Sequence, residues 1–459
     1  MSAQPDSGPR QSAATNTPGS TAPTNTGAAS TAVDPIGASP VYPAGSRLNE
    51  RGHLEIAGCD VVELADRFGT PAYIYAEEDM RARARHYLRA FAARTETFEV
   101  LYASKSLPCT AAYRVMREEG LSVDVASGGE LRMALEAGFD PAKVHLHGNN
   151  KSEAELRYAF DSGIGHLILD SFDEIELADR LLDRPQKVLI RVTPGIKPST
   201  HDYVQTGQLD SKFGFGLADH LAEGAVERVR ASEHLELVGL HAHIGSQIFE
   251  LEPYVKAIDV IAGFCDAVEL QPELLNVGGG LGIAYLDTDE PPSIDSYVDV
   301  KVRGVQRVFD PAPRILVEPG RSLVGNAGVT AYRIGTVKEI PGVRTYVAVD
   351  GGMSDNLRPM LYGSRYEAVI ANRAGETADR RATIAGMHCE SGDVLVRDAD
   401  LAAPRVGDVL VTPATGAYGY ALSNNYNGVP RPPVIFCRDG DARVVVRRET
   451  WDDLLARDQ

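Results

Sequence analysis

The sequence predicts an α/β fold in which a (β/α)8 TIM-type barrel is followed by an all-β C-terminal domain. Three observations predict it. The chain has 459 residues, of which 43% are hydrophobic, so it is long enough for two domains with buried cores. From about Phe98 to Gly320, short β-rich runs alternate with amphipathic stretches rich in Ala, Leu and Glu. After Arg321, strand-like runs follow one another with few helical stretches between them.

The alternating part of the chain contains eight strand-like runs. They are residues 98–104, 121–127, 143–148, 166–171, 187–192, 236–244, 274–279 and 314–320. The clearest helical stretches between them are residues 127–138, 151–163, 171–182 and 253–270. Eight such β/α units in succession favour a closed barrel over an open Rossmann-like sheet.

The C-terminal part predicts a separate all-β domain. Its strand-like runs are residues 329–340, 345–352, 382–386, 393–401, 408–414, 432–437 and 442–448. The stretch Tyr42–Thr70 has few strand signals, and we expect it to pack with this domain. The predicted organisation has four parts: a disordered low-complexity tail (1–40), an N-terminal segment (41–75), the barrel (76–328) and the β domain (329–459).

Composition narrows the function classes. The formal charge of -18 repels phosphate backbones and anionic lipids, so we expect no nucleic-acid or membrane partner. Five widely spaced cysteines without a CxxC pair indicate neither a disulfide framework nor a zinc site. The tail has no apolar run typical of a signal peptide, and no later segment approaches the roughly 18 apolar residues of a membrane span. A cytoplasmic enzyme of small molecules is expected.

Polar residues follow nearly every predicted barrel strand, where catalytic groups of such barrels lie. Gly278, Gly279 and Gly280 follow the seventh strand, and backbone without side chains there lets N–H groups approach a phosphate. The alternative is a plain tight turn. Arg321, after the eighth strand, adds a matching cation and favours the phosphate site, to which Ser246 adds a hydroxyl.

Lys105 follows the first, strongly apolar strand, and a desolvated lysine readily forms a Schiff base. The alternative is a solvated loop lysine. Lys105, a phosphate site and the carboxylate of Glu318 are together what pyridoxal 5'-phosphate requires. His243 is placed to stack on the cofactor ring, whereas His241 is expected to be a satisfied core side chain. A zinc site at these two histidines is rejected because no third ligand converges, so no metal is expected.

Seven segments in order resemble the fold-type III pyridoxal-phosphate decarboxylases, and most closely their diaminopimelate decarboxylase family. The segments are YASKS (102–106), HAHIGSQ (241–247), NVGGGLG (276–282), EPGRSLV (318–324), DGGMSDNLRP (350–359), HCESGD (388–393) and GAYGYALSNNYNG (416–428). The resemblance covers roughly residues 45–450.

The resemblance implies a role for each matching residue. Lys105 is similar to the lysine that binds the cofactor covalently, His243 to the ring-stacking histidine and Glu318 to the partner of the pyridinium nitrogen. The implied cofactor-binding residues also include Ser246, Gly278, Gly279, Gly280, Pro319, Gly320, Arg321 and Tyr418. The implied substrate contacts are Arg321, Arg358, Tyr362, Glu390 and Tyr418.

Cys389 resembles the family's proton donor and is the second implied catalytic residue beside Lys105. The resemblance further implies a head-to-tail homodimer, in which the Cys389-Glu390 segment completes the partner's active site. Without such a partner, Cys389 reads as an inert buried thiol, and Arg358 and Glu390 as surface charges.

The function that follows is that of a carboxy-lyase converting meso-2,6-diaminopimelate to L-lysine and CO2, the last step of lysine biosynthesis. Three alternatives are weighed against it. Decarboxylation of another basic amino acid leaves the CESGD segment unexplained. Only a substrate with a second amino-acid head group needs both an anionic and a cationic contact at its distal end. A cofactor carrier without activity leaves Lys105 and Cys389 unexplained, and a racemase offers no role for Cys389 and Glu390.

Overall fold

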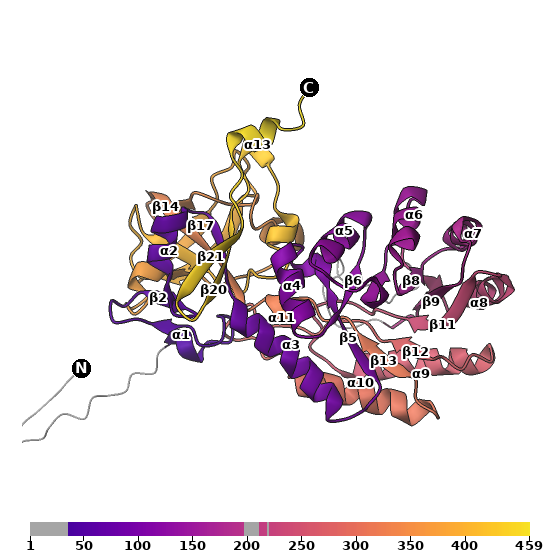
Figure 1. Ribbon diagram of the computed structural model, residues 1–459. Helices are drawn as coiled ribbons and strands as arrows, with labels where there is room; N and C mark the ends of the chain where they lie inside the picture. Colours follow the sequence, from indigo (N-terminus) through magenta and orange to yellow (C-terminus); the bar gives the residue numbers. More distant parts are fainter. Residues whose placement is uncertain (1–34, 197–210, 218–219) are drawn as a thin grey trace, which may run out of the picture. The chain divides into compact units, whose positions relative to one another are not determined.

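The computed structural model of the protein describes residues 35–196, 211–217 and 220–459 (Figure 1). Residues 1–34, most of the predicted tail, lie outside the described residues. The short helix α1 (Pro35–Ala38) follows, and Ile36 in it is buried. Ordered structure therefore begins before residue 41. None of the helices described is long and apolar enough to cross a bilayer.

Eight parallel strands close into a barrel, as the sequence predicts. They are β5 (Phe98–Ala103), β6 (Ser122–Val125), β7 (Val144–Leu146), β8 (His166–Leu169), β9 (Gln186–Thr193), β11 (Leu235–His241), β12 (Leu274–Asn276) and β13 (Arg314–Val317). β13 pairs with β5, and β8 pairs with β9, so the ring has no open edge. The two-residue strand β10 (Phe215–Gly216) pairs in parallel with the C-terminal end of β9.

Amphipathic helices surround the barrel strands (Figure 1). They are α3 (Glu77–Ala92), α4 (Thr110–Glu118), α5 (Gly128–Glu136), α6 (Glu153–Ser162), α7 (Phe172–Leu181), α8 (Leu221–Ala231), α9 (Glu252–Ala267) and α10 (Ile294–Val308). Serine side chains cap four of them by accepting a backbone N–H of the first turn: Ser127, Ser152, Ser171 and Ser293. These caps fix where the chain turns from a strand end into a helix.

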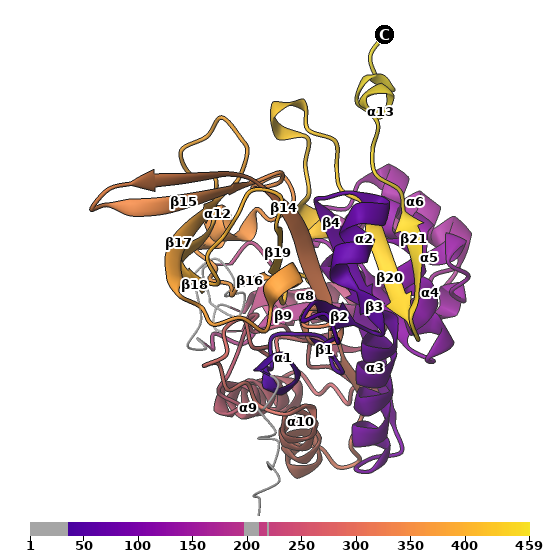
Figure 2. The ribbon, with the colours of Figure 1, turned by 90° about the vertical axis from the view of Figure 1, so that its left-hand side faces the viewer.

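The second sheet is built around the long strand β14 (Gly328–Ile340) (Figure 2). Its other strands are β15 (Arg344–Val349), β16 (Val369–Ile370), β17 (Arg380–Ala385), β18 (Val394–Leu401), β19 (Val409–Thr412), β20 (Val434–Arg438) and β21 (Asp441–Val446). Each predicted C-terminal strand is present. Short helices α11 (Arg321–Val324), α12 (Arg358–Tyr362) and α13 (Trp451–Leu455) complete this part of the chain.

Residues before the barrel contribute a strand to the same sheet. β4 (Ala72–Ala76) lies between β14 and β20, antiparallel to the first and parallel to the second. The stretch before it, which has few strand signals in the sequence, contains helix α2 (Val61–Phe68). It also contains a small sheet of three strands: β1 (Arg47–Leu48), β2 (Leu54–Ile56) and β3 (Cys59–Asp60).

Candidate active site

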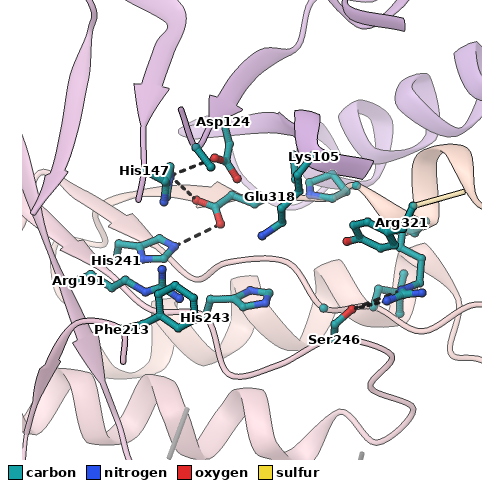
Figure 3. A pocket seen from close by; sticks show the side chains of 18 of the residues that line it. Lys105, Asp124, His147, Arg191, Phe213, His241, His243, Ser246, Glu318 and Arg321 are labelled. Carbon is teal, nitrogen blue, oxygen red and sulfur yellow. Dashed lines mark hydrogen bonds and ion pairs between the residues drawn. The ribbon is translucent and has the colours of Figure 1, made fainter. Parts of the chain in front are cut away.

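A cavity of about 350 Å³ lies at the C-terminal ends of the barrel strands (Figure 3). Its lining comes from many different strand ends, which is how this barrel type assembles a site. The polar lining residues include Lys105, Asp124, His147, Arg191, His241, His243, Ser246, Glu318, Arg321 and Tyr418. The structure therefore gathers side chains that are up to about 300 residues apart in the sequence.

Glu318, directly after β13, is a buried carboxylate held from three sides. His147 Nε2 lies 3.1 Å from Oε1, His241 Nε2 lies 3.2 Å from Oε2, and Asn276 Nδ2 donates to Oε1 at 2.7 Å. Burial by itself raises the pKa of Glu318, but His241 and His147 outweigh it and hold the pKa well below its usual range. The carboxylate is thus charged in a buried place, ready for a cationic partner.

The structure corrects one expectation about His241. It is buried, as predicted, but it contacts Glu318, and its Nδ1 has no hydrogen-bond partner among the described residues. It is therefore part of the site rather than a satisfied core side chain. His147, His241 and Glu318 offer ligand atoms within 4.8 Å of one another, a grouping that the sequence does not indicate. His243 does not join this group.

Lys105 and His243 occupy the middle of the cavity (Figure 3). Lys105 lies in a short 3-10 turn, Ser104–Ser106, after β5. The sequence predicts a desolvated amine, but the side chain has accessible surface that faces the cavity. Burial lowers the pKa of Lys105, yet Tyr418, Asp124 and Glu318 outweigh it and raise the pKa above its ordinary value. The amine is thus charged and directed into the cavity.

His243 carries no charge at neutral pH, because burial and the nearby Lys105 hold its pKa well below the usual value. Its Nδ1 accepts a hydrogen bond from the backbone N–H of Gly279 at 3.2 Å. A neutral ring in a fixed orientation suits stacking on an aromatic ligand.

The other end of the cavity is lined by Ser246, Gly280, Gly320 and Arg321. Arg321 donates to Ser246 Oγ from Nη2 at 2.9 Å and makes a short hydrogen bond to the Tyr285 hydroxyl. A Cβ at Gly280 would lie 2.5 Å from the carbonyl oxygen of Gly245. Because only backbone fits there, this end has the room and the donors that a phosphate needs.

The cavity fits pyridoxal phosphate end to end. A carboxylate for the pyridinium nitrogen, an amine for the aldehyde and a donor-rich end for the phosphate follow one another in Figure 3. Gly278 and Gly279 do not line the cavity, although the sequence places them in the phosphate site. Together with Gly280 they form the glycine turn (Gly278–Gly280), with Gly278 at φ +63° and Gly280 at φ +105°.

A second cavity, of about 470 Å³, shares Ser246, Arg321 and Tyr418 with the first. Arg358 and Tyr362 from α12 line it as well. The two arginines are buried, and neither forms an ion pair with a carboxylate within the described ranges. Both are instead hydrogen-bonded to tyrosine hydroxyls, Arg321 to Tyr285 and Arg358 to Tyr366. Two uncompensated cations in one cavity form a site for an anion.

Tyr418 connects the two cavities. Its backbone is in the left-handed region, at φ +66°, and its N–H donates to the carbonyl of Ser106 at 2.9 Å. Its ring lies 4.8 Å from the guanidinium carbon of Arg321. A non-glycine residue in this conformation is typical of functional positions.

Cys389 and Glu390 lie apart from both cavities. Both are exposed, and the Cys389 N–H donates to Asn427 Oδ1 at 3.0 Å. Pro319 lines the first cavity, as the sequence predicts. One chain therefore gathers every predicted site residue in or beside the cavities except this exposed pair.

Several residues of the site were not assigned a role from the sequence. Asp124 and Asn276 are polar residues inside apolar strands, a signal that could have found them. Burial raises the pKa of Asp124 to about 6. Tyr285 and Tyr366 follow no strand of the barrel directly, so only the fold brings them to the arginines.

Comparisons with known proteins agree with this geometry. Residues 77–325 match the family described as "Pyridoxal-dependent decarboxylase, pyridoxal binding domain". A diaminopimelate decarboxylase of Bacillus subtilis (strain 168) is 48% identical over 425 residues, which are 90% of this chain and 97% of the relative. One of Mycobacterium tuberculosis (strain CDC 1551 / Oshkosh) is 42% identical over 440 residues, 91% of this chain and 97% of that protein.

Solved structures give the same result. The crystal structure of diaminopimelate decarboxylase from M. jannaschii in co-complex with L-lysine has a TM-score of 0.85 and 32% identity, covering 90% of this chain and 97% of that chain. The Helicobacter pylori enzyme complexed with L-lysine has a TM-score of 0.79 and 29% identity, covering 86% and 98%. The chain belongs to the diaminopimelate decarboxylase family of the pyridoxal-dependent decarboxylases.

Proposed function

We propose that the protein removes CO2 from meso-2,6-diaminopimelate and releases L-lysine, as the last step of lysine biosynthesis. The names of its relatives and the L-lysine complexes of two structural neighbours support this reaction. The observation that carries it is the anion site formed by Arg321 and Arg358. This anion site adjoins the cavity that contains Lys105. A substrate whose amine is held in the Lys105 cavity therefore places a carboxylate in the second cavity, beside the two arginines.

In this proposal Lys105 is the residue that would hold the cofactor through its aldehyde, and its amine lies in the cavity that would admit the substrate amine. When bound, pyridoxal phosphate accepts the electron pair of the Cα–carboxylate bond as CO2 leaves. Glu318 would hold a proton on the ring nitrogen, since His241 and His147 keep the pKa of this carboxylate well below its usual value and so keep it charged. His243 stacks against the ring face, and Ser246, Gly280, Gly320 and Arg321 hold the phosphate.

Arg358, Tyr362 and Tyr418 orient the substrate by binding its distal carboxylate in the second cavity. This orientation sets the bond to be broken perpendicular to the cofactor ring, which is the geometric condition for the reaction. A monocarboxylic amino acid such as ornithine has no distal carboxylate and leaves Arg358 unpaired.

Cys389 and Glu390 act from a second subunit in this proposal. Their exposure and their distance from both cavities are what a shared site in a head-to-tail homodimer requires. Exposed apolar side chains nearby support an interface: Met360, Leu361 and Met387. Across it, Cys389 protonates Cα and Glu390 binds the distal ammonium group.

The substrate is tested by measuring CO2 release from meso-diaminopimelate, L-lysine, L-ornithine and L-arginine with the cofactor-loaded protein. We expect turnover of meso-diaminopimelate alone, at least 10³-fold above the others, because unpaired buried charges penalise the wrong substrate strongly. Preference for a monocarboxylic diamino acid would refute the proposal.

The cofactor attachment is tested separately with borohydride. Reduction of the loaded protein followed by peptide mapping should place the pyridoxyl group on Lys105. Lys105→Ala should lose both the label and CO2 release, whereas the exposed Lys256→Ala on α9 should keep both. A label on another lysine would overturn the assignment.

A further inference from the structure

Lys301, in α10, is fully buried although it contacts no carboxylate among the described residues. Its Nζ donates to the carbonyls of Val277 at 2.7 Å and Gly278 at 2.9 Å. It also lies over the rings of Tyr254 and Tyr297, 4.5 and 4.3 Å from their centroids. A buried lysine is costly, so a position like this one requires a reason.

The two tyrosines bind the same stretch of backbone. The Tyr297 hydroxyl donates to Gly278 O at 3.2 Å, and the Tyr254 hydroxyl donates to Gly279 O at 3.3 Å. Lys301, Tyr254 and Tyr297 thus form an outer cluster that holds three successive carbonyls, from Val277 to Gly279. Lys301 and Tyr254 do not line the first cavity and contact the glycine turn (Gly278–Gly280) from outside it, whereas Tyr297 also lines that cavity.

The carbonyl directions fix the opposite N–H directions. In a trans peptide, the C=O of one residue and the N–H of the next point to opposite sides. Because the carbonyls of Gly278 and Gly279 face the outer cluster, the N–H groups of Gly279 and Gly280 face the other side. The Gly279 N–H donates to His243 Nδ1, and Gly280 lines the first cavity.

The Gly279 hydrogen bond also determines the form of the His243 ring. Because Nδ1 accepts, the proton of the neutral imidazole is on Nε2. The orientation of the glycine turn therefore affects both the phosphate end of the cavity and His243 in its middle.

We propose that Lys301 is a positioning residue for the cofactor. It holds the carbonyls of Val277 and Gly278, which keeps the Gly279 N–H on His243, and it packs on the ring of Tyr254, whose hydroxyl holds the Gly279 carbonyl and so aims the Gly280 N–H at the phosphate. Its donors are needed more than its charge, since a neutral amine also has N–H groups for two carbonyls. The inference rests on the proposed function in one respect, that this end of the cavity binds the phosphate.

The test compares two ligands on the apoprotein. Dissociation constants of pyridoxal 5'-phosphate and of pyridoxal, which lacks the phosphate, are measured by absorbance for the wild type, Lys301→Met and Lys301→Gln. Methionine keeps the length and apolar packing of the side chain but has no donor, whereas glutamine keeps an N–H donor without charge. Lys256→Met, an exposed lysine of α9, is the control.

We expect Lys301→Met to weaken binding of pyridoxal 5'-phosphate by roughly ten- to a hundredfold and that of pyridoxal by less than about threefold, as loss of buried donors predicts. Lys301→Gln should recover part of the difference, and Lys256→Met should match the wild type. The ³¹P chemical shift of the bound cofactor should move in Lys301→Met only.

The outcomes separate the two ideas. If the wild type itself binds both ligands equally, the phosphate assignment fails. If the wild type prefers the phosphorylated ligand and Lys301→Met weakens both ligands equally, Lys301 supports only the fold and the inference is wrong. Should Lys301→Met not fold, Tyr254→Phe removes the hydroxyl that holds the Gly279 carbonyl and must show the same selective loss, or the inference is likewise wrong.

Discussion

At the scale of single residues, the site depends on how its charges are held. Glu318 is a carboxylate in a buried place, and it stays charged because His147, His241 and Asn276 contact it. Its value for catalysis lies in that fixed charge, since a preorganised group needs no rearrangement when charge develops in the transition state.

Glu318→Gln tests this directly. Glutamine keeps the shape but removes the charge and replaces one accepting oxygen by an NH2 donor, so we expect the cofactor to remain bound and kcat to fall by on the order of 10²- to 10³-fold. Steady-state kinetics with the absorbance spectrum of the bound cofactor measure both effects. Glu252→Gln, an exposed residue of α9, should leave kcat unchanged. A kcat within twofold of wild type in Glu318→Gln contradicts the assigned role.

Residue-level prediction from the sequence succeeded where position alone was informative. Lys105, His243 and Glu318 follow barrel strands, and they meet in one cavity as expected. His241 was misjudged because alternation along a strand does not reveal a buried partner such as Glu318. Asp124 was missed for a similar reason, since a polar residue within a strand faces either the helices or the barrel interior.

At the scale of elements, the glycine turn decides how closely the strand ends approach one another. A Cβ at Gly279 would lie 2.2 Å from the carbonyl oxygen of Glu318. Backbone would have to move, and the nearest backbone belongs to Glu318, the proposed partner of the pyridinium nitrogen.

Gly279→Ala should therefore lower stability by about 1–3 kcal/mol, the usual cost of overpacking, and abolish cofactor retention. Thermal unfolding of apo and loaded protein measures the two effects. Gly263→Ala in α9 is the matched control, because a Cβ there meets nothing within 4 Å, and it should stabilise slightly. Normal cofactor binding by Gly279→Ala would contradict the close approach.

The eight barrel strands and the C-terminal strands were predicted because each is a short apolar run between turn signals. Which strands pair with one another was harder to predict from the sequence. Nothing local to Ala72–Ala76 indicates that it pairs with β14 and β20, and β1 to β3 are too short to leave a pattern.

At the scale of the whole molecule, the single chain gathers all but two of its expected site residues. Cys389 and Glu390 remain at the surface, which the proposed homodimer explains. This arrangement predicts complementation between two inactive proteins.

Lys105→Ala and Cys389→Ala should each be inactive, because each lacks one part of every site. Coexpressed in equal amounts, they should recover about a quarter of wild-type activity, since half of randomly paired dimers are mixed and each has one intact site. A mixture of Lys105→Ala with Glu318→Gln is the control. Both changes affect the part of the site that the barrel contributes, so neither site of a mixed dimer is intact. Absence of recovery in the first mixture, with dimers verified by ultracentrifugation, argues against the shared site.

The position of β4 has a consequence for how the chain matures. Its neighbours β14 (Gly328–Ile340) and β20 (Val434–Arg438) emerge from the ribosome long after it does, because both follow the whole barrel in the chain. Until β14 and β20 have been synthesised, the backbone N–H and C=O groups on the two edges of β4 have no strand to pair with. All eight barrel strands are synthesised before that point. A strand with unpaired edges can pair with strands of other chains. We therefore expect the newly synthesised chain to bind chaperones that shield extended segments.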